Sequence, residues 1–98
     1  MIRHIVSWKL RAEDEAGKAA AVAEITAQLT ALVPLIPEIL SLTVGANVNP
    51  AADFDVALVA DYESLDTLAV YQDHPAHQAA AAVIREFVAA RAAVDFVV

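Results

Sequence analysis

Three histidines, His4, His74 and His77, are the side chains of this sequence best suited to moving protons near neutral pH. Their unperturbed pKa of about 6.5 allows an imidazole to take up or release a proton under physiological conditions. The chain has no cysteine, which excludes thiolate catalysis, disulfides and cysteine-bound metal. The histidines are therefore the first candidates for general acid–base chemistry.

Other kinds of site find little support in the sequence. His74 and His77 are three positions apart, a spacing that two metal ligands on one helix face can use. Pro75 disturbs that geometry, and neither a His-Glu-x-x-His motif nor a carboxylate-rich loop accompanies the pair, so we expect no metal. The only glycines are Gly17 and Gly45, which excludes a glycine-rich phosphate loop. No serine lies in a nucleophile-elbow context.

Length and charge narrow the class of protein. The 98 residues suit a single domain spanning 1–98, and 59% of them are hydrophobic. A net charge of −7 disfavours nucleic acid and anionic membrane surfaces as partners. The first residues lack the apolar stretch of a signal peptide, and the apolar segment 32–40 is interrupted by Pro34, Pro37 and Glu38. We expect a soluble, cytoplasmic protein that binds neither nucleic acid nor membrane.

The periodicity of apolar residues predicts how the chain positions these histidines. Strands are expected over 2–10, 39–48, 54–62 and 92–98, and helices over 19–33, 65–73 and 75–90. Ser64 is a suitable N-cap for the second helix, and Pro75 should start the third at a real break after Asp73. His74 would then cap or bridge this junction rather than take part in chemistry.

The order strand, helix, strand, strand, helix, strand predicts an α+β, ferredoxin-like βαββαβ subunit with an antiparallel four-stranded sheet. Alternation places His4 with Val6 and Trp8 on the more apolar face, which the helices should cover. The other face is expected to mix apolar and polar side chains, namely Ile5, Ala57, Val59 and Val97 with Ser7, Asp61 and Asp95. In the last strand, Val94, Phe96 and Val98 share the opposite side. A half-apolar, uncovered face on a small sheet indicates a partner.

Several segments resemble the stress-responsive dimeric α/β-barrel (Dabb) family. The opening Ile-Arg-His-Ile-Val-Ser-Trp-Lys is similar to the first strand of that family, and Tyr-Gln-Asp-His-Pro-Ala-His-Gln at 71–78 is similar to its most specific motif, Tyr-x-x-His-Pro-x-His. Leu-Ile-Pro at 35–37 and Ala-Val-Asp-Phe at 93–96 also fit. The resemblance covers essentially the whole chain. It implies a homodimer in which two sheets pack face to face into a barrel, with the helices outside.

The resemblance also implies a site. Its best understood members are plant polyketide cyclases, such as olivetolic acid cyclase, which close a polyketide by aldol condensation without metal or organic cofactor. The residues that correspond to their active site are His4, Tyr71 and His77. His77 would act as base, while Tyr71 and His4 would orient the substrate or donate to an oxygen. We accordingly expect no cofactor, and a small apolar or polyketide-like ligand.

An alternative is a non-catalytic homodimer, related to stress tolerance or to ligand binding. In that case His4 and Tyr71 would simply satisfy each other or nearby backbone groups. The two hypotheses differ in whether an open cavity reaches both His4 and His77, or whether Trp8, Tyr62 or Phe87 fills that space.

Overall fold

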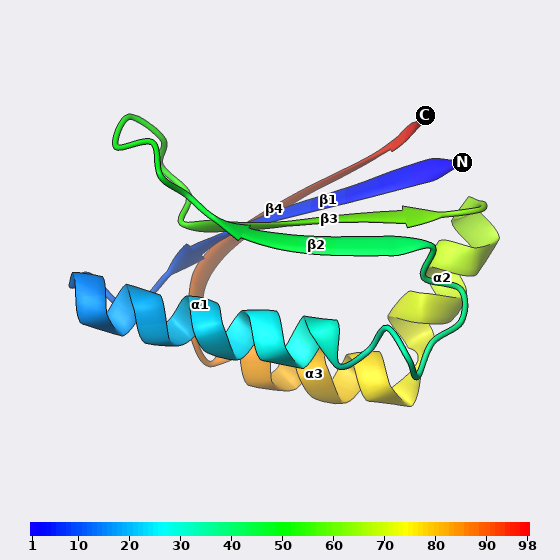
Figure 1. Ribbon diagram of the computed structural model, residues 1–98, viewed down its shortest axis with the longest axis horizontal. Coiled ribbons are helices and arrows are strands. Elements are labelled where there is room, and N and C mark those ends of the chain that lie inside the picture. The colour runs from blue at the N-terminus through cyan, green and yellow to red at the C-terminus, as the bar shows by residue number, and fades with distance from the viewer.

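The computed structural model describes residues 1–98 and has two layers, a sheet and a set of helices on one of its faces (Figure 1). In chain order the elements are β1 (Ile2–Leu10), α1 (Glu15–Thr30), β2 (Ser41–Ala46), β3 (Val56–Tyr62), α2 (Leu65–Asp73), α3 (Pro75–Arg85) and β4 (Val88–Val97). The sheet order is β2-β3-β1-β4, and every neighbouring pair is antiparallel. The expected ferredoxin-like βαββαβ fold is confirmed. None of the helices has the length and apolar character that crossing a membrane requires.

The core lies between the sheet and the long helices α1 and α3, which run side by side across one face (Figure 1). Apolar side chains of β1 and β3 alternate towards these helices, as period-two patterning requires. Val6 and Leu58 meet Ile25 and Leu29 of α1, and all four are 2% exposed or less. The turns after α1 also contribute, since Ile36 is fully buried. The opposite face of the sheet carries no helix.

The chain breaks between α2 and α3 at His74, as expected. His74 has extended backbone angles (φ −62°, ψ 135°) and ends one helix while capping the next. Pro75 occupies the first position of α3, where its missing N–H costs no helical hydrogen bond. Ser64 caps α2 through a capping box with Thr67.

Two boundaries near the end of the chain differ from the prediction. Helix α3 ends at Arg85 rather than near residue 90, and β4 begins at Val88 rather than at 92. The reason is backbone pairing with the long first strand. The Arg11 amide donates to the Phe87 carbonyl at 2.9 Å, and Leu10 pairs with Val88. These contacts outweigh the helix propensity of the alanine-rich segment.

The faces of β4 were also assigned wrongly from the sequence. Asp95 pairs directly with His4 and Val97 with Ile2, which puts Asp95 and Val97 on the helix-covered side. Val94 and Phe96 lie on the open face instead. A shift of one residue in register exchanges the two faces of a strand, and a β-bulge at Lys9/Leu10 adjusts the register here.

Candidate functional site

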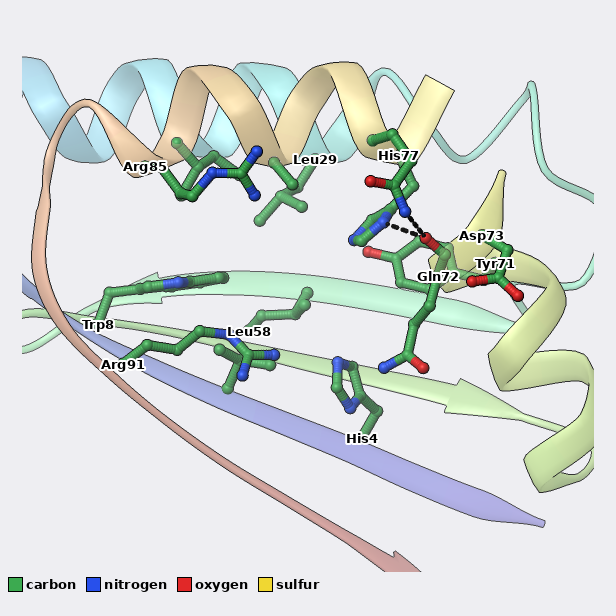
Figure 2. Close-up of a pocket in the computed structure, with 14 residues that line it drawn as sticks. His4, Trp8, Leu29, Leu58, Tyr71, Gln72, Asp73, His77, Arg85 and Arg91 are labelled. Atoms are coloured by element: carbon green, nitrogen blue, oxygen red, sulfur yellow. Dashed lines mark hydrogen bonds between the residues drawn. The ribbon is translucent and has the colours of Figure 1, made fainter. Parts of the chain in front are cut away.

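A cavity of about 350 Å³ lies between the sheet and the helices of the subunit (Figure 2). Its floor is formed by β1 and β3, and its walls by α3 and the end of α2. Half of its lining residues are hydrophobic, 7 of 14. A cavity of this size, in which apolar side chains surround several converging polar groups, is suited to a small molecule.

The structure brings His4, Tyr71 and His77 to this one cavity, where all three are lining residues. Trp8 lines the cavity without filling it, and neither Tyr62 nor Phe87 occupies it. The open space thus reaches both histidines. His74 lies outside the lining, and no group of three or more metal-binding side chains occurs in the chain.

His4 is held by Asp95, a partner that sequence analysis had not found. His4 is 3% exposed, and its Nδ1 contacts the Asp95 carboxylate, which stands directly opposite on β4. A carboxylate acceptor at Nδ1 favours the tautomer with the proton on that nitrogen. Nε2 is then the ring nitrogen left to face a ligand. The hydrogen-bond partner of His4 is therefore the Asp95 side chain, and neither Tyr71 nor a backbone group, the two partners that the alternative hypothesis allowed.

His77 lies in the first turn of α3, half-buried, with its ring over the cavity (Figure 2). Its Nδ1 donates a hydrogen bond to the Gln72 carbonyl at 2.9 Å, a contact made possible by the break before α3. The proton is thereby fixed on Nδ1, and Nε2 carries a free lone pair. Burial lowers the pKa of His77, the hydrogen bond to the Gln72 carbonyl opposes this in part, and the nearby guanidinium groups of Arg91 and Arg85 lower the pKa further. A neutral imidazole with a free Nε2 is suited to act as a general base at pH 7.

Tyr71 closes α2 directly beside His77, with the two ring centroids 4.4 Å apart. Its ring is fully buried, and no protein group meets its hydroxyl with hydrogen-bond geometry, although the Tyr62 hydroxyl is close enough for the two phenols to shift each other's pKa. Burial raises the pKa of the Tyr71 phenol, so that the group remains a protonated donor. A buried hydroxyl without a partner is uncommon and calls for an explanation.

Tyr62 joins the two histidines through a row of aromatic rings. The ring centroid of Tyr62 lies 6.3 Å from that of His4 and 5.0 Å from that of Tyr71. The Tyr62 hydroxyl is also buried without a partner, and burial raises its pKa. Four titratable aromatic side chains are thus neighbours in space and form a row from β1 to α3, namely His4, Tyr62, Tyr71 and His77.

Two arginines complete the polar lining, and sequence analysis missed both of them. Arg85 comes from the last turn of α3 and Arg91 from β4. Arg91 was hidden because its strand begins earlier than expected. Arg85 was missed because only apolar residues were used to predict which side of α3 faces the sheet.

Comparison with known proteins agrees with this architecture. A family model described as the stress responsive A/B barrel domain matches residues 2–98. A dimeric ferredoxin-like protein of unknown function from Thermobifida fusca is 35% identical, with a TM-score of 0.84, and the match covers 99% of this chain and 90% of that one. A dimeric protein of unknown function and ferredoxin-like fold from Bacteroides fragilis is 32% identical, with a TM-score of 0.88 and coverage of 97% and 93%.

More distant structures share the fold alone. A hydroxynitrile lyase from Passiflora edulis is 17% identical, with a TM-score of 0.84 over 99% of this chain and 92% of that one. No curated protein matches the chain.

Proposed function

The chain belongs to the stress-responsive A/B barrel domain family, and we propose that it is a homodimer whose subunits each catalyse proton transfer at a carbon next to a carbonyl group. The reaction would be a cyclisation or isomerisation of a small ligand that is largely apolar or polyketide-like, and would use no metal or organic cofactor. The observation that carries the proposal is the pairing of a base and a donor. The Nε2 atom of His77 is free and its tautomer fixed, while the adjacent Tyr71 hydroxyl has no partner.

The chemistry follows from these two groups. Nε2 of His77 removes a proton from the carbon next to the carbonyl, and the electron pair of the C–H bond moves to the carbonyl oxygen. The Tyr71 hydroxyl donates a hydrogen bond to the oxygen as its negative charge develops, which also gives that hydroxyl the partner it lacks. The resulting enolate then attacks a second carbonyl of the same ligand, or recovers a proton from His77 at another carbon.

His4 would orient the ligand from the opposite side of the cavity. Its contact with Asp95 fixes the ring and leaves Nε2 available to a ligand oxygen. Asp95 would therefore act as a positioning residue, because it touches His4 and not the ligand.

The open face of the sheet supports the proposed dimer. Val59, Val94 and Phe96 on this face are 37%, 56% and 43% exposed. The charges of Arg3 and Asp61 on the same face are paired, with Nε–Oδ1 and Nη2–Oδ2 distances of 2.9 and 3.1 Å. A paired arginine and aspartate can be covered by a partner at lower cost than isolated charges. The two similar bacterial proteins described as dimeric agree with this arrangement.

Hydrogen–deuterium exchange at the carbon next to a ketone tests the proposal without knowledge of the natural substrate. Phenylacetone in D₂O loses its methylene proton signal when a base removes those protons, and proton NMR follows the loss. We expect the protein to accelerate this exchange with saturation in phenylacetone. His77→Gln should return the rate to the buffer background, and Tyr71→Phe should reduce it.

His74→Asn is the matched control, since asparagine is also a good helix N-cap and His74 lies outside the cavity. This variant should retain the wild-type rate. Exchange that persists in His77→Gln at the wild-type rate would remove His77 from its role as base. An absence of acceleration by the wild-type protein would favour the non-catalytic homodimer.

A further inference from the structure

Two guanidinium groups at the cavity have no counter-ion. Arg85 and Arg91 both line the cavity, and in Figure 2 the Arg85 side chain lies above Trp8, on the helix side, while the Arg91 side chain lies below it, beside Leu58. Neither guanidinium donates a hydrogen bond to the protein or forms an ion pair. The three ion pairs of the chain are Arg3–Asp61, His4–Asp95 and Lys18–Asp55.

This arrangement is unusual for a chain with a net charge of −7, which has 13 acidic residues and only 6 lysines and arginines. Two of those six basic residues line the same cavity. The acidic lining residue is Asp73, which is exposed at the end of α2. The carboxylate of Asp95 is occupied by His4. The cavity is therefore locally positive within an acidic protein, a distribution that concentrates anions.

A purely structural role explains one arginine better than the other. Arg85 stands in the last turn of α3, where a positive charge favours the helix dipole. Arg91 lies on a strand, so no helix dipole favours a positive charge at its position. It lies on β4 opposite Trp8, on the side of the sheet that otherwise carries apolar residues near that position. Both arginines are exposed, so water can solvate their charges, but because they approach one cavity from α3 and β4 they offer a bound anion two guanidinium donors.

We propose that the ligand of this cavity is an apolar or aromatic keto acid, whose carboxylate binds to Arg85 and Arg91. The forked guanidinium group matches a carboxylate through paired hydrogen bonds, and two such groups from different elements can hold it from both sides. The apolar body of the ligand would lie against Trp8, Leu58 and Ile84, which line the space between. The ketone would then reach His77 and Tyr71, and this last step rests on the proposed proton transfer.

The positive field also serves the chemistry. Both arginines contribute to the lowered pKa of His77, after the larger effect of burial. They thus help to keep the base neutral in the protein without ligand.

Three probes that share one skeleton test the assignment: 3-benzoylpropionate, its uncharged amide, and the phosphonate that replaces the carboxylate. Binding is measured by NMR titration of the ¹⁵N-labelled full-length protein at low and at raised ionic strength. We expect the carboxylate to shift amides that border the cavity and to bind about tenfold or more tightly than the amide, the difference expected from losing charge-assisted hydrogen bonds. Raised ionic strength should weaken the binding of the carboxylate and leave the binding of the amide unchanged.

Arg85→Gln and Arg91→Gln should each reduce carboxylate affinity to nearly that of the amide. Arg85→Lys and Arg91→Lys keep the positive charge but lose the two parallel N–H donors of the guanidinium group. Their carboxylate affinity should therefore lie between that of the wild type and that of the glutamine variants. They also provide a second test if a glutamine variant misfolds. Lys9→Gln is the matched control, because it removes one positive charge at an exposed position outside the cavity. It should bind the carboxylate like the wild type.

Each other outcome overturns the assignment in a recognisable way. Equal binding of amide and carboxylate, or unchanged affinity in both arginine variants, removes the carboxylate site and leaves the exchange reaction of phenylacetone unaffected. Binding of the phosphonate with no binding of the carboxylate assigns the arginines to a phosphate group instead. If no probe binds while phenylacetone exchange persists, the keto-acid assignment is wrong and the proton-transfer proposal remains.

Discussion

His74 and His77 stand three positions apart, yet their Nδ1 atoms make opposite kinds of hydrogen bond. Nδ1 of His74 accepts from the Ala76 amide at 3.0 Å, which caps α3. Nδ1 of His77 donates to the Gln72 carbonyl at 2.9 Å, which leaves Nε2 free over the cavity. The same side chain is therefore a structural cap in one position and a candidate base in the next turn, because of the backbone groups that each ring meets.

The lowered pKa of His77 predicts the pH dependence of the exchange reaction. Only the neutral imidazole can remove a proton, so the rate should rise with pH through a midpoint that lies below the ordinary histidine pKa of about 6.5. The pH profile of phenylacetone exchange and an NMR titration of the His77 ring should give the same midpoint. A midpoint above the ordinary value would contradict the effect of burial.

The same pKa shift predicts a loss of stability in acid. The folded protein disfavours charged His77, so the unfolded chain takes up this proton first as the pH falls below about 6.5. The contribution of His77 to stability is thus fully present above that pH and is lost as the pH falls through the lower, folded-state pKa. Urea unfolding at several pH values should show a shallower decline in His77→Gln, with His74→Asn as reference.

Removal of the partner of His4 should destabilise the fold. In Asp95→Ala the buried Nδ1–H of His4 loses its acceptor, which costs about 1–3 kcal/mol. Asp95→Asn keeps an acceptor oxygen and should lose less. The free energies of unfolding in urea compare the two variants directly, and equal values would mean that Asp95 does not hold His4 in solution.

At the scale of elements, local signals predicted the starts of α2 and α3, whereas α1 begins at Glu15 rather than at 19, and long-range pairing determines the end of α3 and the faces of β4. The break at His74, the start of α3 at Pro75 and the cap at Ser64 follow from residues next to each other in the chain. The orientation of His4 towards the helices also followed from alternation within one strand. The end of α3 and the faces of β4 depend instead on pairing with β1, far away in sequence. Asp95 and Arg91 could not be found for that reason.

The cap of α2 offers a test at this scale, because this helix positions Tyr71. The Ser64 side chain accepts from the Thr67 amide at 3.2 Å. Ser64→Ala should therefore cost about 0.5–2 kcal/mol of stability, whereas Ser64→Asp should retain most of it, since aspartate also caps helices well. Thermal unfolding monitored by circular dichroism measures both. A wild-type melting temperature in Ser64→Ala would show that the cap adds nothing here.

At the scale of the whole molecule, the helices cover one side of the sheet and the other side stays open (Figure 1). Strand β4 serves both sides, because Asp95 holds His4 on the covered side while Val94 and Phe96 lie on the open face. The predicted mixed character of the open face is therefore retained, although two of its expected members changed places with their neighbours. The apolar residues that replaced them make this face more suitable for a partner.

The open face predicts the oligomeric state. Sedimentation equilibrium at micromolar concentration should give a mass near twice 10.4 kDa. Phe96→Glu, alone or with Val94→Glu, places an unpaired charge in the proposed interface and should yield monomers. Val70→Glu on α2, at a position 50% exposed, is the matched control and should remain dimeric. A monomeric wild-type protein, or a dimeric double variant, would be inconsistent with packing through this face.

The pairing of β1 with β4 also determines when the protein can fold during its synthesis. Within this domain β1 is synthesised before β4, yet the two strands are neighbours in the sheet, and the Val98 amide donates to the Met1 carbonyl at 2.9 Å. Until β4 emerges, one edge of β1 has no partner and the cavity lacks Arg91 and Asp95. Closing a loop of nearly the full chain length is slow, so a nascent chain must wait with an exposed strand edge. The site is thus completed only once β4 has been synthesised.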